Sequence, residues 1–199
     1  MELLCVDLQN DFASPGGVYY SPKESLGFVL DELFPFLEER EILISEIISD
    51  YRQPRKGDPR DCCRPGEWGY RSLVPVGLRK GDLWLKCMNS PVWTRKGIGD
   101  PETIPGEPYP DPGGFEEWLE GAVGGPDEAG IVVVFGLTLD RCVLCTVQEL
   151  SFRGYDVRVL IEATDLSSGS LEEKEGFLTS IPFIYWGKRI EWNELRSML

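Results

Sequence analysis

Short apolar runs alternate with amphipathic stretches along most of the chain. Residues 131–135 form an uninterrupted apolar run rich in β-branched side chains, which is typical of a strand covered on both faces in a parallel sheet. Gly136 interrupts that run, Asp140 is a candidate helix cap, and apolar residues then recur at near-helical spacing as far as Gly154. Residues 157–163, which are mostly apolar, are expected to form a second buried strand. Together these segments predict a strand–helix–strand unit.

The rest of the chain continues the alternation. We expect strands at residues 3–8, 42–48, 82–87 and about 183–185, and helices at residues 25–41, 115–123, 171–179 and 191–199. Residues 88–114 are rich in Gly and Pro without periodicity, which predicts a long loop of the kind that is usually functional or mobile. Strands that alternate with helices, with no internal repeat, predict a single doubly wound α/β domain over residues 1–199, in three layers.

The charge balance excludes some classes of partner. Acidic residues number 34 against 20 basic ones, which gives a formal net charge of -14. This disfavours nucleic acid and anionic membranes as partners. The sequence has no apolar run long enough to span a membrane, and Glu2 followed by a strand-like segment does not resemble a signal peptide. We therefore expect a cytoplasmic protein.

The chain has six cysteines and no histidine. Cys62 and Cys63 are adjacent, and Cys5 and Cys87 fall within predicted buried strands, which makes a poor disulfide framework. We expect reduced thiols. The absence of histidine excludes Cys–His and Ser–His catalysis and any histidine-ligated metal. A carboxylate, a lysine or a helix dipole must therefore activate any reactive cysteine.

Three reactive residues fall at predicted strand ends. Asp7 follows the first strand, Lys86 ends the third and Cys142 follows the fourth, at the start of a helix. Because the carboxyl ends of parallel strands share one edge of a sheet, we expect all three in one crevice. The helix start is expected to lower the pKa of Cys142. Asp7 can exchange a proton with the thiol and a leaving amine, Lys86 can stabilise a thiolate, and backbone N–H groups of Thr138 and Cys142 can form an oxyanion hole.

Several segments resemble the isochorismatase-like cysteine hydrolases. In chain order these are LLCVDLQNDF, RPGEWG, GDLWLKCMNSPVW and GLTLDRCVLCTVQELSFRGYDVRVLIEATD. Their order and spacing are similar to those of that family, apart from substitutions within each motif. The resemblance implies a six-stranded, mainly parallel sheet and oligomers in which neighbouring subunits often complete the site. It also implies a catalytic triad, with Asp7 as general base, Lys86 as its charged partner and Cys142 as nucleophile. A cis peptide bond between Leu137 and Thr138 is implied as well.

Departures from the family pattern reduce the range of substrates that we expect. The family's nicotinamidases hold a metal with an Asp-x-His motif, which is Asp50-Tyr51-Arg52 here, so we expect no metal and no cofactor. Its true isochorismatases lack the cysteine nucleophile, so Cys142 argues against that activity. With these two branches set aside, the sequence is similar to the metal-free amidases of the family, such as N-carbamoylsarcosine amidase and ureidoacrylate amidohydrolase. The implied reaction is cleavage of a C–N bond in a small non-peptide amide or ureide through a thioester, by a homo-oligomer.

Other interpretations of these residues remain open. Cys142 and Cys145 form a C-x-x-C motif, which is also typical of thiol redox proteins. A non-catalytic member of the fold is a further alternative. Zinc binding by Cys62, Cys63 and the C-x-x-C pair is disfavoured, because adjacent cysteines are poor tetrahedral ligands.

Aromatic and basic side chains are candidates for substrate binding. Phe12, Trp68 and Trp93 either line a pocket for a planar substrate or belong to the core. Arg52, Arg64 and Arg141 either bind a substrate carboxylate or are ordinary surface charges. The sequence does not choose between these alternatives.

Overall fold

The computed structural model describes residues 1–57, 60–180 and 185–199, and its centre is a six-stranded sheet in the order β3-β2-β1-β6-β7-β8. Every neighbouring pair in this sheet is parallel. The strands are β1 (Glu2–Val6), β2 (Ser45–Ser49), β3 (Trp84–Lys86), β6 (Ile131–Leu137), β7 (Asp156–Asp165) and β8 (Lys188–Ile190). The predicted α/β class and parallel six-stranded sheet are confirmed.

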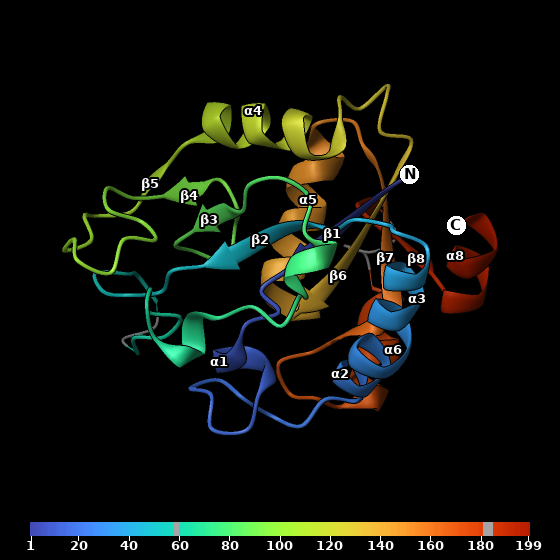
Figure 1. Ribbon diagram of the computed structural model, residues 1–199, viewed down its shortest axis with the longest axis horizontal. Helices are drawn as coiled ribbons and strands as arrows, with labels where there is room; N and C mark the ends of the chain where they lie inside the picture. Colours follow the sequence, from blue (N-terminus) through green and yellow to red (C-terminus); the bar gives the residue numbers. More distant parts are fainter. Residues whose placement is uncertain (58–59, 181–184) are drawn as a thin grey trace.

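Helices cover both faces of the sheet (Figure 1). They are α1 (Asn10–Ala13), α2 (Glu24–Phe28), α3 (Phe34–Glu39), α4 (Pro112–Val123), α5 (Leu144–Phe152), α6 (Leu171–Leu178) and α8 (Trp192–Met198), with π-helical turns at η1 (Val29–Leu33) and η4 (Leu139–Val143) and 3-10 turns at η2 (Trp68–Tyr70) and η3 (Val76–Leu78). In both views α4 and α5 lie on one side, and the continuous α2–η1–α3 segment lies on the other. There Trp192 of α8 packs edge-on against Phe28 and Phe36.

The apolar run that the sequence singled out is the centre of the core. Val132, Val133, Val134 and Phe135 are each completely buried, and burial of a large apolar side chain contributes about 1.5–3 kcal/mol. Gly136 does not interrupt the strand as expected, since β6 continues to Leu137. Its φ is 117° and a Cβ atom there would overlap the carbonyl of Val6 on β1. The glycine is therefore required by the close approach of two paired strands.

The helix after β6 begins differently from the expectation. It starts with η4, whose N-cap residue Thr138 makes no side-chain capping bond. Asp140 is not the cap: its carboxylate accepts hydrogen bonds from the backbone and hydroxyl of Ser167, at 2.8 and 2.6 Å. The helix was expected to end at Gly154, and this is close to its observed end: α5 ends at Phe152, and Gly154 has a φ of 89°.

The segment expected to be a long loop contains structure of its own. Strands β4 (Trp93–Thr94) and β5 (Tyr109–Pro110) pair in antiparallel fashion, and α4 already begins at Pro112 with Asp111 as its cap. The buried Arg52 side chain holds the intervening backbone by donating to the carbonyl oxygens of Gly97, Asp100 and Thr103 at 3.0–3.1 Å. The Arg52 guanidinium thus supplies hydrogen bonds to loop carbonyl groups that, in a helix or a sheet, would be bonded to backbone N–H groups.

Near the carboxyl terminus, the strand expected at residues 183–185 falls mainly outside the described residues. The sixth strand of the sheet is β8, a few residues later, and the expected closing helix is α8. Among the described helices, none has the length and apolar character needed to cross a bilayer.

Glu46 of β2 is a buried acid that gives a test of the fold. Burial raises its pKa from 4.5 to about 7, although a hydrogen bond from Ser72 and the charge of Arg79 oppose this shift. The folded protein therefore binds this proton more tightly than the unfolded chain, and the stabilisation is complete below pH 4.5 and lost as the pH rises through 7.

We predict that Glu46→Gln raises the free energy of unfolding by about 1–3 kcal/mol at pH 8 and changes it little at pH 4. Urea denaturation at both pH values measures the difference. A loss of stability of equal size at both pH values would contradict the assignment, because it would show that the pKa of this carboxyl group does not differ between the folded and the unfolded protein.

Candidate active site

Asp7 lies one residue beyond the end of β1, not on the strand itself. Its φ is 53°, a left-handed conformation that aspartate tolerates better than most residues. Its backbone N–H donates to the carbonyl of Ile47 on β2 at 2.9 Å, which holds the turn against the sheet. The carboxylate is completely buried, and Oδ1 accepts a hydrogen bond from the Ser49 hydroxyl at 2.9 Å.

Lys86 is the last residue of β3 and is also completely buried. Its ammonium group is surrounded by acceptors: Asp7 Oδ2 at 2.7 Å, Ser49 Oγ at 2.7 Å, the Tyr51 hydroxyl at 2.8 Å and the Met88 carbonyl at 3.3 Å. Burial alone would lower the pKa of Lys86, but the electrostatic effects of Asp7, Cys142 and Tyr51 together outweigh burial and hold that pKa well above its usual range. Lys86 and Asp7 therefore form a buried ion pair.

Cys142 completes the cluster from the other side of β1. It lies in the η4 turn directly after β6, and only 5% of it is exposed. Its sulfur lies 3.3 Å from Lys86 Nζ and 3.2 Å from the Tyr51 hydroxyl oxygen. The structure thus brings together the acid, the amine and the thiol, which the sequence placed at three strand ends.

The expected lowering of the Cys142 pKa is wrong. Burial raises the pKa of the thiol to about 12, the Lys86 ammonium lowers it, and the Asp7 carboxylate raises it again. Proximity to the start of a helix does not overcome desolvation at a site this enclosed. The resting sulfur is therefore a neutral thiol, and it needs a base to become a nucleophile.

Tyr51 is a site residue that the sequence reasoning overlooked. Its hydroxyl oxygen accepts from Lys86, so its own hydrogen is free to point to Cys142 Sγ or to Asn89 Oδ1, 3.3 Å away. Burial raises the pKa of Tyr51 well above 10, so it remains a donor at neutral pH. The signal was available, because Tyr51 follows β2 at the same sheet edge as the other three residues.

We predict that Tyr51→Phe slows alkylation of Cys142 by iodoacetamide by about tenfold at pH 8. The Tyr51 hydrogen bond lowers the pKa of the thiol, so its removal raises that pKa and leaves less thiolate. Because the thiol pKa is near 12, the rate should rise about tenfold per pH unit between pH 7 and 10 in both proteins. Peptide mapping separates Cys142 from the other thiols. A rate independent of pH, or unaffected by the substitution, would contradict this role for the hydroxyl.

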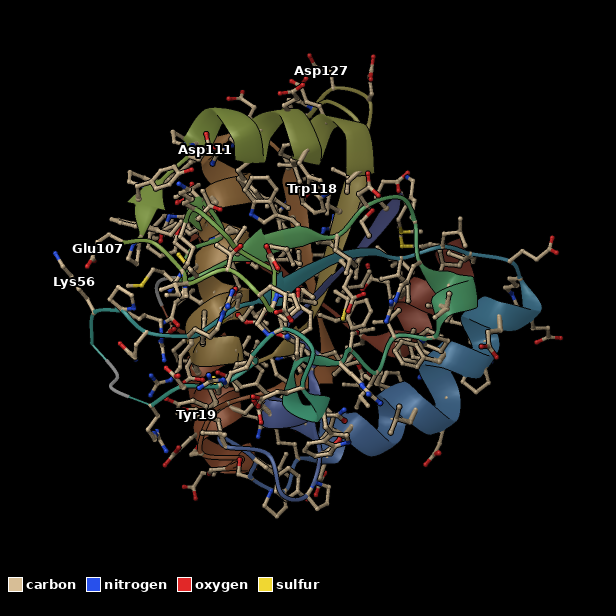
Figure 2. The ribbon with its side chains drawn as sticks, turned by 60° about the vertical axis from the view of Figure 1, so that its left-hand side comes forward. Tyr19, Lys56, Glu107, Asp111, Trp118 and Asp127 are labelled. Carbon is tan, nitrogen blue, oxygen red and sulfur yellow. The ribbon has the colours of Figure 1, made fainter. Side chains whose placement is uncertain are left out.

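A cavity of about 780 Å³ opens above the sulfur of Cys142, within the usual range for small-molecule sites. Phe12 and Trp93 line it, together with Tyr51, Leu137 and Thr138. Figure 2 labels two other lining residues, Tyr19 and Lys56, on the left-hand side of that view.

Trp68 is not among the residues that line the cavity, although the sequence placed it with Phe12 and Trp93 as a binding candidate. It lies in η2, its side chain is 46% exposed, and its backbone carbonyl accepts a hydrogen bond from Asn10. Its contribution is made by the backbone, which a pattern of aromatic residues does not reveal.

Thr138 lines the cavity together with Cys142. The peptide bond between Leu137 and Thr138 is cis. The carbonyl of Thr138 accepts from the backbone N–H groups of Arg141 and Val143, at 3.0 and 3.2 Å, which fixes the turn. Its hydroxyl oxygen is buried without a hydrogen-bond partner among the described residues. A polar atom of this kind is available to a bound molecule.

Within the described parts of the chain, one group of side chains has the composition of a metal site: Asp11, Cys62 and Cys63. All three are buried, and the Asp11 carboxylate already accepts from the backbone N–H groups of Val18 and Cys63. These bonds give Asp11 a structural role in the loop. Cys62 and Cys63 are both free thiols in the structure.

Asp50 and Arg52 occupy the positions that the sequence compared with a metal-binding motif. The Asp50 carboxylate is completely buried and makes an ion pair with the Arg52 guanidinium at 2.6 Å. It also accepts from the backbone N–H of Gly99. The carboxylate that would bind a cation is therefore neutralised by an arginine of the same chain, and Arg52 is a buried structural cation.

Cys145 lies one helical turn after Cys142 but does not line the cavity. Both are free thiols, and burial raises the pKa of Cys145 as well. A C-x-x-C redox site normally depends on a lowered thiol pKa, so neither cysteine has the electrostatic environment of that class.

No protein-family model and no curated protein sequence matches the chain. Several solved structures do match the chain. An isochorismatase-like hydrolase from Alkaliphilus metalliredigens aligns with a TM-score of 0.68 at 16% identity, over 99% of this chain and 97% of that one. A nicotinamidase/pyrazinamidase from Bacillus subtilis gives 0.66 at 16% identity, over 96% and 100%. N-carbamoylsarcosine amidase from Thermoplasma acidophilum gives 0.60 at 16% identity, over 96% of each chain.

Agreement over nearly the whole length of both chains is agreement in topology, and at this level of identity it establishes the fold. The order of the six strands, the site at their carboxyl ends and the three matched structures lead to one assignment. The chain has the fold of the isochorismatase-like hydrolases.

Proposed function

We propose that the protein is a cysteine amidohydrolase that cleaves a C–N bond in a small non-peptide amide or ureide. The observation that carries the proposal is the contact between Lys86 Nζ and both Asp7 Oδ2 and Cys142 Sγ, at 2.7 and 3.3 Å, at the bottom of the cavity. Among the structural relatives, a nicotinamidase and an N-carbamoylsarcosine amidase are named for hydrolysis of such bonds.

The raised pKa of the thiol determines the first step. Asp7 accepts the proton of Cys142 as the sulfur attacks the carbonyl carbon of the substrate, so that a free thiolate does not accumulate. Lys86 and the Tyr51 hydroxyl stabilise the charge that develops on sulfur. The substrate oxygen becomes negative in the tetrahedral intermediate and is stabilised by backbone N–H groups at Thr138 and Cys142.

Collapse of the intermediate breaks the C–N bond. The proton held by Asp7 passes to the departing nitrogen, which leaves as ammonia or an amine, and the acyl group remains on Cys142 as a thioester. Water then attacks the thioester while Asp7 takes its proton, and that proton returns to the sulfur. The sum is amide plus water to acid plus amine, with no metal or cofactor in any step. Asp7 is suited to both steps because it is fixed by Ser49 and Lys86.

The experiment that tests the proposal is release of ammonia or amine from a panel of small amides and ureides, run in parallel on the unmodified protein and on Cys142→Ala. Turnover by the unmodified protein alone is the expected result. Turnover of equal rate by both proteins would refute cysteine catalysis, and so would a complete absence of turnover across a panel that spans neutral, anionic and cationic compounds.

We also expect a homo-oligomer, because proteins of this fold family often complete their sites across a subunit interface. Light scattering coupled to size-exclusion chromatography measures the assembly. A monomer with full activity would contradict a shared site.

A further inference from the structure

The cavity has a charge opposite to that of the protein as a whole. The chain has a formal net charge of -14, yet four of the residues that line the cavity are basic: Arg55, Lys56, Arg60 and Arg141. No aspartate or glutamate of the described residues lines it. A basic cavity in an acidic protein attracts small anions.

Arg55 differs from the other arginines of this region in what its guanidinium contacts. Arg52 is paired with Asp50 and Arg141 with Asp140, at 2.6 and 3.7 Å. Arg55 has no carboxylate partner among the described residues. One of its terminal nitrogens donates to the Arg60 carbonyl at 3.4 Å. Its Nε is buried, and no described residue supplies a hydrogen-bond acceptor for it. A half-buried cation with an unused donor is costly unless a ligand supplies the acceptor.

Tyr51 connects this cation to the reacting sulfur. The guanidinium carbon of Arg55 lies 4.2 Å from the centre of the Tyr51 ring, while the hydroxyl at the tip of that ring lies 3.2 Å from Cys142 Sγ. The guanidinium is therefore about one aromatic side chain away from the sulfur. A molecule with its carbonyl carbon at the sulfur and an anionic group a few bonds away spans this interval.

We propose that Arg55 binds a carboxylate of the substrate, so that the substrate class is a small amide or ureide that also carries a carboxylate. The inference rests on the proposed function. Guanidinium binds carboxylate through two parallel hydrogen bonds, and stacking on Tyr51 holds the donor plane in one orientation. Arg55 thereby selects anionic substrates and positions their scissile bond over Cys142.

The test measures the charge preference at Cys142 without requiring a substrate. Two methanethiosulfonate reagents of similar size are compared, one with a 2-sulfonatoethyl group and one with a 2-(trimethylammonio)ethyl group. Each forms a mixed disulfide with Cys142 and releases methanesulfinate, and peptide mapping follows the modification. Because the same thiol attacks both reagents, the ratio of the two rates cancels any change in the thiol pKa and reports the local charge.

We expect the unmodified protein to favour the anionic reagent and Arg55→Gln to lower the anionic-to-cationic rate ratio by about tenfold or more, with Arg55→Lys in between. Arg40→Gln is the matched control: Arg40 also stacks on an aromatic ring, Phe36, at 3.7 Å, but lies outside the cavity lining, so its loss should leave the ratio within about twofold. An unchanged ratio in Arg55→Gln would overturn the inference.

Turnover provides the second measurement. N-carbamoylglycine and its uncharged amide form a matched pair, and Arg55→Gln is expected to lower kcat/KM for the carboxylate by about 10- to 100-fold with little change for the neutral compound. Equal loss for both compounds would overturn the inference and leave cysteine catalysis intact. Turnover that survives in Cys142→Ala would instead refute the proposed function, so the two failures are distinguishable.

Discussion

Cys142→Ala is expected to lower kcat by about 10⁴- to 10⁶-fold on any compound that the protein hydrolyses. The variant removes the only atom that the proposed mechanism lets attack the carbonyl carbon, while the cavity and the Asp7–Lys86 pair remain. Residual turnover then reflects binding and the oxyanion site alone. The measurement is release of ammonia or amine under conditions in which the unmodified protein completes many turnovers.

The matched control for that prediction is Cys145→Ala. Cys145 lies on the same helix, one turn further on, and is a partly buried free thiol outside the cavity lining. Its loss should leave kcat within about threefold. If the two variants lost activity equally, the C-x-x-C pair would be acting as a unit and the assignment of Cys142 as sole nucleophile would be wrong.

The second large effect concerns the buried ion pair. Lys86→Met should lower the free energy of unfolding by about 3–5 kcal/mol, because Asp7 would remain buried without its countercharge. It should also abolish turnover. Asp7→Asn, which removes the base, should abolish turnover too, and should leave Lys86 without its anionic partner.

The double variant Asp7→Asn with Lys86→Met distinguishes a lost ion pair from lost packing. With both charges removed, we expect much of the stability to return, so that the double variant is more stable than Lys86→Met alone. Urea denaturation of the single and double variants at pH 7 gives the coupling free energy. A double variant whose loss equals the sum of the single losses would contradict a buried ion pair.

The fold was accessible from the sequence because its strands have a strong local signal. In β6, the buried valines form an uninterrupted apolar run that is required by burial on both faces. The gathering of Asp7, Lys86 and Cys142 followed from topology, since residues at the carboxyl ends of parallel strands meet at one edge. The family resemblance supplied their roles, which remain for experiment to test.

Other features depend on contacts that no local pattern contains. The close approach of Val6 requires a glycine at position 136 within β6, and hydrogen bonds from Arg52 order a loop that has no periodicity of its own. Desolvation set the pKa of Cys142 in the direction opposite to the helix dipole, because burial depends on the complete fold. Tyr51 was overlooked since it was considered only within a comparison with a metal-binding motif.

The pattern of burial also explains why the site is ordered before a substrate binds. Asp7, Ser49 and Lys86 are completely buried and joined by hydrogen bonds of 2.7–2.9 Å. Gln9 adds two more bonds that tie the segment after β1 to Ser49 at the end of β2. Such a network holds these side chains in fixed positions. Only Cys142 and Tyr51 of the central cluster reach the cavity lining.

The central claim is that the acyl group passes through a thioester on Cys142, and competition between water and hydroxylamine tests it most directly. Two amides that share one acyl group and differ in their leaving amine are hydrolysed in the presence of hydroxylamine, and the ratio of hydroxamate to acid is measured for each. A common thioester predicts the same ratio for both compounds. A ratio that changes with the leaving amine would contradict the account, because water would then attack the substrate directly.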